Sequence, residues 1–164
     1  MKKDGQMEIT FGMIFSIIII IVTVSIAFYV IWKFVQTEEC INVGFFFDSL
    51  DKKVDSAYKA TIVKDSFSSN LPSGITAVCF GELDKNAVGS DLTKQNELKS
   101  NYATLNSNAN IYFYPLEQGC GGDFTYHKVA HVTTNNFFCV DVKNEKITIS
   151  LEKGAYDALV KLSE

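Results

Sequence analysis

The apolar residues of this chain are concentrated in one uncharged stretch near the N-terminus. Ile9–Trp32 contains no charged residue, and Ile17–Val22 at its centre is uninterrupted aliphatic sequence. As a helix rising about 1.5 Å per residue, this stretch is about 36 Å long, enough to cross a hydrocarbon core of about 30 Å. β-branched residues are helical in lipid because unpaired backbone groups are too costly there. The pattern predicts a transmembrane helix over residues 9–35, preceded by a short leader of residues 1–8.

Two other interpretations of the apolar stretch are a cleavable signal peptide and a buried core helix. The stretch is longer than the hydrophobic region of a signal peptide, and no small-x-small cleavage site follows it. A core helix of such uniform apolarity needs a far larger protein around it. Tyr29 and Trp32 near its end suit a membrane interface. The membrane span is therefore favoured over both.

The charges beside the span predict its orientation. Lys2 and Lys3 precede it, whereas Glu38 and Glu39 follow it closely. Because positively charged flanks stay in the cytoplasm, the leader is expected inside the cell. Residues 36–164 are then an extracytoplasmic domain, anchored in the cell membrane by a single pass.

Beyond the span the apolar residues recur at steps of three and four, the spacing of an amphipathic helix. The residues that share this face are Val43, Phe46, Leu50, Val54 and Ala57. We expect one long helix from about residue 8 to about residue 61, with its first half in lipid and its second half against a globular domain.

The remaining sequence reads mainly as short strands. The strand-like runs are Ile75–Phe80, Ile111–Tyr114, Tyr126–Val132, Phe137–Val142 and Lys146–Leu151. We expect a loop over Ser66–Gly74, a short helix near Leu92–Tyr102 and a hairpin turn at Asn144-Glu145; Tyr156–Leu162 is a strand or a short helix. The expected fold class is α+β, a long N-terminal helix packed on a small, mostly antiparallel β-sheet.

All four cysteines, Cys40, Cys79, Cys120 and Cys139, lie beyond the span. An even number of cysteines in a small domain outside the cytoplasm predicts two disulfides, and the three possible pairings stay open. Zinc is the alternative, but no two cysteines have the close spacing of a zinc knuckle. We therefore expect no metal and no cofactor.

The charge and the polar motifs do not indicate an enzyme. The chain carries a net charge of −4, and its acidic excess lies beyond the span, so nucleic acid is not an expected partner. His127 and His131 lack a third metal ligand at a recognisable spacing. Asp48, Asp51 and Asp55 lack the glycine and glutamate of a calcium loop and predict a solvated helix face. No catalytic residue is predicted.

The N-terminal segment Lys2-Lys3-Asp4-Gly5-Gln6-Met7-Glu8 resembles the class III signal sequence of archaeal type IV pilins. That family has a short basic leader ending in glycine, then glutamine, and a glutamate that opens the apolar segment. The resemblance implies peptidase cleavage after Gly5, a new N-terminus at Gln6 and a role for Glu8 in assembly. The sequence departs from the family at Asp4, where a basic residue is usual, and at Glu8, which is third after the cleavage site rather than fifth.

Within the span, Gly12, Ser16, Thr23 and Ala27 are separated by four, seven and four residues. This spacing lines them along one side of a helix, and small residues there let helix backbones approach closely in lipid. The alternative is scatter, because small residues are common in membrane spans. The pattern predicts a helix-packing face, with other membrane helices or further copies of the chain as partners beside the lipid.

Together these features predict a single-pass, membrane-anchored surface protein with a structural or interaction role. The resemblance adds the expectation of a pilin-like filament subunit. The alternative is a membrane-anchored enzyme or ligand-binding accessory subunit that has no recognisable motif.

Overall fold

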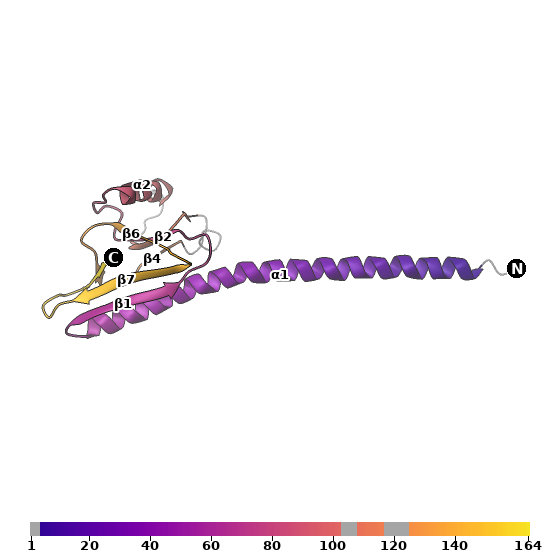
Figure 1. The fold of residues 1–164 in the computed structure, drawn as a ribbon, viewed down its shortest axis with the longest axis horizontal. Coiled ribbons are helices and arrows are strands. Elements are labelled where there is room, and N and C mark those ends of the chain that lie inside the picture. Colours follow the sequence, from indigo (N-terminus) through magenta and orange to yellow (C-terminus); the bar gives the residue numbers. More distant parts are fainter. Residues whose placement is uncertain (1–3, 103–107, 117–124) are drawn as a thin grey trace. The chain divides into compact units, whose positions relative to one another are not determined.

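The chain has an α+β fold, as the sequence predicts (Figure 1). The structure is a computed structural model that describes residues 4–102, 108–116 and 125–164. The chain divides into two compact units, Met1–Glu38 and Glu39–Glu164. Helix α1 (Asp4–Lys59) contributes its first part to one unit and its second part to the other.

The second unit contains two four-stranded sheets. The first sheet consists, in spatial order, of β1 (Val63–Asn70), β7 (Lys146–Lys153), β8 (Val160–Ser163) and β5 (Val132–Thr133). Strands β1 and β7 lie side by side (Figure 1) and pair antiparallel over eight residues each. Strand β8 pairs antiparallel with β7 and parallel with β5. The sheet is therefore mixed, with one parallel pair.

The second sheet is antiparallel throughout. Its strands, in spatial order, are β4 (Tyr126–His127), β3 (Ile111–Tyr114), β2 (Ala77–Phe80) and β6 (Phe138–Asp141). Helix α2 (Ser90–Tyr102) lies at the β6 edge. There the Asp91 carboxylate accepts a hydrogen bond from the Cys139 N–H (3.2 Å), and Lys94 pairs with Asp141 (2.9 Å). The Asp91 carboxylate thus satisfies one outward backbone donor of the edge strand, and the Lys94–Asp141 pair places charge beside it.

The core of the second unit forms around the apolar stripe of α1. All five residues that the helical spacing singles out are buried. They pack in one cluster with Phe67 and Ile149 of the first sheet and with Phe80 and Phe113 of the second. The second half of α1 is helical chiefly because this stripe is buried against both sheets.

The central strands of the second sheet are buried on both faces. Val78 and Phe80 of β2 belong to the cluster around α1, whereas Ala77 and Cys79 belong to a second cluster that includes Leu98 of α2. Because both faces are covered, these strands are continuous apolar runs rather than alternating ones. This explains why their positions are clear in the sequence.

The C-terminal end of α1 is satisfied by a side chain from β7. The ammonium group of Lys153 donates hydrogen bonds to the carbonyl oxygens of Tyr58 and Ala60. Carbonyls of the last helical turn have no partner inside the helix, and a cation there also opposes the helix dipole. The β-branched Thr61 and Ile62 that follow favour extended backbone and lead into β1.

Three details of the sequence-based prediction are wrong. The domain has two sheets rather than one. The loop expected over Ser66–Gly74 begins only after Asn70, because residues 63–70 form β1. The single strand expected over Tyr126–Val132 is broken into β4 and β5, and His131 between them has a positive φ of 62°.

Of the hairpin expected at Asn144-Glu145, the turn forms but the two flanking strands do not pair with each other. Both turn residues have positive φ, 51° and 58°, and Lys143 and Lys146 exchange backbone hydrogen bonds across them. The flanking strands β6 and β7 then separate into different sheets. In the tail, where Tyr156–Leu162 is predicted as a strand or a short helix, a strand forms only from Val160 and is β8 (Val160–Ser163).

Candidate functional site

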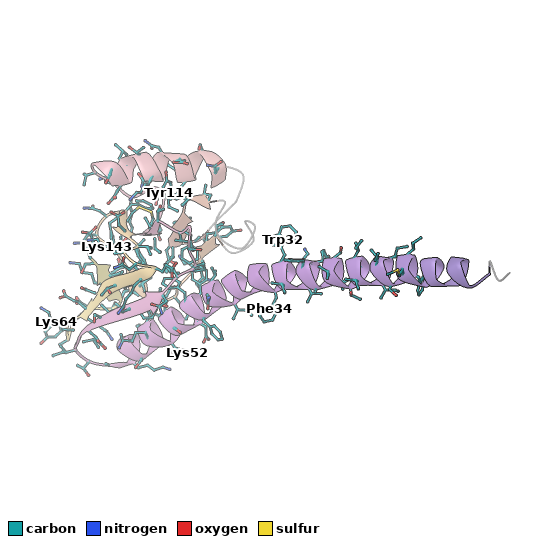
Figure 2. The ribbon with its side chains drawn as sticks, turned by 45° about the vertical axis from the view of Figure 1, so that its right-hand side comes forward. Trp32, Phe34, Lys52, Lys64, Tyr114 and Lys143 are labelled. Carbon is teal, nitrogen blue, oxygen red and sulfur yellow. A yellow bond between two sulfur atoms is a disulfide. The ribbon has the colours of Figure 1, made fainter. Side chains whose placement is uncertain are left out.

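The first unit contains a helix that is long enough and apolar enough to cross a membrane. Residues Gly12–Phe34 have a mean hydropathy of 2.9, and none of the side chains is buried within the structure. Figure 2 shows Trp32 and Phe34 projecting from this helix, with 61% and 72% of their surface exposed. A helix that is apolar on every side is stable only when lipid or other helices cover it.

The serine and threonine hydroxyl groups within this segment are satisfied inside the helix. Ser16 and Ser25 donate to carbonyl oxygens four residues earlier, at 2.9 Å and 2.7 Å. Thr23 donates to the carbonyl oxygens three and four residues earlier, at 2.9 Å and 3.0 Å. In a hydrocarbon environment, a hydroxyl group without a hydrogen-bond partner raises the free energy by several kcal/mol. These side chains therefore need no other partner there.

The small residues predicted to form a helix-packing face all lie in this helix. Gly12 has no neighbouring atom near the position a Cβ would take, and Ser16, Thr23 and Ala27 are exposed. Helix packing at this face stays a prediction. Gly5, Gln6 and Glu8, the expected processing and assembly residues, fall within the first turns of α1, and their side chains lie outside the described part of the structure.

The second unit contains a disulfide between Cys79 and Cys139. The two residues lie opposite each other on β2 and β6 and are 0% and 5% exposed. Cys40 is also in a disulfide, and Cys120 lies outside the described residues. Of the two disulfides predicted from the sequence, the structure thus describes one, within a domain in which none of the described cysteines is free.

The two histidines contact α1 separately and do not form a pair. Nε2 of His127 lies 2.8 Å from Oδ2 of Asp51, and the ring packs on Phe47. The ring of His131 stacks on Tyr58 with 3.8 Å between centroids. Within residues 4–102, 108–116 and 125–164, no group of three acidic, histidine or cysteine side chains is arranged to hold a metal.

The exposed side of α1 in the second unit changes from apolar to charged along its length. Ile41 and Phe45 are 50% and 62% exposed, and Gly44 beside them has open space around it. One turn later the surface carries ion pairs of Asp48 with Lys52 (2.7 Å) and Asp55 with Lys59 (2.6 Å). Of the three acidic residues predicted to form a solvated helix face, Asp48 and Asp55 are paired with lysines, whereas Asp51 contacts His127. The exposed apolar pair of Ile41 and Phe45 is not predicted from the sequence. The sequence nevertheless shows that these two residues are four positions apart and lie outside the buried stripe.

A cavity of about 120 Å³ lies beside the C-terminal half of α1. Its lining residues are Lys53, Ser56, Ala57, Ala60, Val63, Asp65 and Leu151. Nζ of Lys53 lies 2.5 Å from Oδ2 of Asp65, and Oδ1 of Asp65 accepts the Ser66 N–H at 2.7 Å. The hydrogen bond from Lys53, followed by that from Ser66, lowers the pKa of the Asp65 carboxyl group.

The lowered pKa of Asp65 predicts a pH dependence of stability. A carboxyl group with a folded-state pKa below its unfolded value stabilises the fold above the unfolded pKa, here 3.8. This stabilisation is lost as the pH falls through the folded-state pKa. We expect Asp65→Asn to flatten the dependence of the unfolding midpoint on pH below about 4, measured by urea unfolding. Asp55→Asn is the matched control; an unchanged slope for Asp65→Asn would contradict the assignment.

Comparisons of the chain with protein family models, with curated proteins and with solved structures found no match. The fold and the site define a general class, a disulfide-containing α+β domain that follows an apolar helix able to span a membrane. A narrower function must therefore be argued from the sequence and structure of this chain itself.

Proposed function

We propose that this chain is a single-pass membrane protein that holds an extracytoplasmic domain in a structural or interaction role. The observation that carries the proposal is a contrast within α1. Residues 12–34 are apolar on every side and exposed, whereas the later part of the same helix buries a single stripe against its own domain. The first segment therefore requires a covering that comes from outside the chain.

Two observations support the extracytoplasmic placement. Lys2 and Lys3 precede the span, and acidic residues follow it. The Cys79–Cys139 disulfide is the kind of bond that persists in oxidising compartments. Both features favour a cytoplasmic N-terminus and a domain outside.

The second disulfide of the domain is proposed to join Cys40 to Cys120. Cys79 and Cys139 pair with each other, and Cys40 is not free, which leaves Cys120 as its partner within the chain. Mass mapping of peptides without reduction should find both bridges and no free thiol. A Cys40 linked to a second chain would contradict the intrachain pairing.

The narrower proposal is that the chain is a pilin-like filament subunit. The segment Gly5-Gln6-Met7-Glu8 supports cleavage before assembly. The exposed Ile41 and Phe45 support contact of α1 with other helices, because exposed apolar side chains are stabilised when a partner covers them. After cleavage the spans would pack against one another, and Glu8 of one subunit would pair with the new α-amino group of a neighbour. A buried carboxylate without such a partner would be costly.

The test of the filament proposal is the N-terminus of the native protein. We expect mass spectrometry to find Gln6 as the first residue, and Gly5→Val to leave Met1–Gly5 attached. Gly12→Val, a glycine with open space around it, is the matched control and should be cleaved normally. Glu8→Ala should impair assembly and leave membrane insertion intact. Native protein that retains Met1–Gly5 and stays wholly in the membrane fraction would reject the filament and leave the anchored surface domain.

A further inference from the structure

Strand β1 lies at the edge of its sheet. Among the described residues, only β7 pairs with it, over its full length of eight residues. The N–H of Leu71, directly after β1, donates to the Glu145 carbonyl on the β7 side. Backbone groups alternate in direction along an antiparallel strand, so the even-numbered positions of β1, Ser66 included, direct their N–H groups away from β7. This edge has the backbone polarity needed to accept a further strand.

The cavity described above lies between this edge and α1. Its floor is apolar, with Ala57 of α1, Val63 of β1 and Leu151 of β7. Lys53 and Asp65 lie at its polar side and pair with each other. A volume of about 120 Å³ suits one small apolar side chain rather than a whole organic ligand.

The carboxylate of Asp65 satisfies two donors that belong to different elements. One oxygen accepts the outward N–H of Ser66 in β1, and the other accepts the ammonium group of Lys53 in α1. A carboxylate of another chain would satisfy the same two donors. The Asp65 side chain is 49% exposed, and exposed ion pairs contribute little to stability, so a competing carboxylate can displace it at small cost.

We propose that the groove between β1 and α1 binds an extended, carboxylate-bearing peptide segment of a partner protein. The peptide adds as a strand to the β1 edge, places a small apolar side chain in the cavity, and its carboxylate replaces that of Asp65 on Ser66 and Lys53. Main-chain pairing supplies affinity in this mode of recognition, and the pocket and the charged pair supply selectivity. The site is independent of the membrane helix and of filament assembly.

The test uses the full-length protein in detergent micelles and a fluorescein-labelled octapeptide of alternating threonine and valine with a free C-terminal carboxylate. Binding is measured by fluorescence anisotropy, and the same peptide as a C-terminal amide is the first control. We expect the carboxylate peptide to bind about tenfold more tightly than the amide, the size of effect typical of a charge-assisted hydrogen bond.

Two substitutions should change the affinity in opposite directions. Asp65→Ala removes the internal competitor and should tighten binding of the carboxylate peptide about tenfold, whereas Lys53→Met should weaken it about tenfold. Asp55→Ala and Lys52→Met alter a neighbouring exposed ion pair each and should leave the affinity within about twofold.

The proposal would be overturned by equal binding of the carboxylate and amide peptides or by an affinity that Lys53→Met leaves unchanged. It would also be overturned if Asp65→Ala bound the carboxylate peptide more weakly or with unchanged affinity, or if no variant bound it. Concentration-dependent dimerisation of Asp65→Ala that excludes the peptide would assign the groove to a second copy of this chain instead, and would also reject a partner peptide.

Discussion

Replacing Phe46 with alanine is expected to destabilise the domain formed by residues 39–164 by about 3–5 kcal/mol, the usual cost of removing a buried aromatic side chain. Phe46 is fully buried. Its ring contacts those of Phe47, Phe67 and Phe113, with centroid distances of 5.4, 5.7 and 5.4 Å. It therefore joins α1 to both sheets, and its loss leaves a cavity where the three elements meet. The measurement is chemical denaturation of the full-length protein in detergent, followed by near-ultraviolet circular dichroism.

The neighbouring Phe45 provides the matched control for this substitution. It is 62% exposed on the same helix, whereas Phe46 is fully buried. Phe45→Ala is expected to change the free energy of unfolding by less than about 0.5 kcal/mol. If α1 meets other helices through this surface, the same substitution lowers self-association instead. Equal destabilisation by both substitutions would contradict the packing of α1 described here.

Removal of the Cys79–Cys139 disulfide, with both residues replaced by alanine, is expected to cost about 2–5 kcal/mol. The bond closes a loop with a sequence separation of 60, so it restricts the unfolded chain considerably. It also lies between β2 and the edge strand β6, in the cluster with Leu98 of α2. The expected result is a lower urea midpoint for the double variant than for the oxidised wild-type protein.

A reducing agent distinguishes the two bridges in the same experiment. If Cys40 is bridged to Cys120, reductant should lower the midpoint of the double variant further. An unchanged midpoint would show that the Cys40 bond contributes nothing to domain stability. A double variant as stable as the oxidised wild-type protein would contradict the structural role given to Cys79–Cys139.

The helical part of the fold is predicted well by the sequence because its periodic signals are long. An uncharged run and then an apolar stripe from Val43 to Ala57 both indicate helix, and α1 includes both. Strands β2 and β3 are also recognisable, since burial on both faces makes them continuous apolar runs.

The parts that were missed depend on tertiary context. The sequence predicts a loop from Ser66 onward, where β1 continues to Asn70, because only Phe67 is buried among the polar residues of this edge strand. The division into two sheets follows from strand pairing between distant segments, which local patterns do not reveal. In the candidate sites, the apolar span was evident in the sequence. The Lys53–Asp65 pair was not, because it joins a helix to a strand across a turn.

The most direct test of the membrane-anchored, extracytoplasmic assignment is labelling of lysines on intact cells with a membrane-impermeant amine reagent. Lys52 and Lys64 of the domain (Figure 2) have 74% and 87% of their side-chain surface exposed. We predict that Lys52 and Lys64 are both modified in intact cells, while a cytoplasmic marker protein is modified only after lysis. Modification of Lys52 and Lys64 only after the cells are broken open would contradict the assignment.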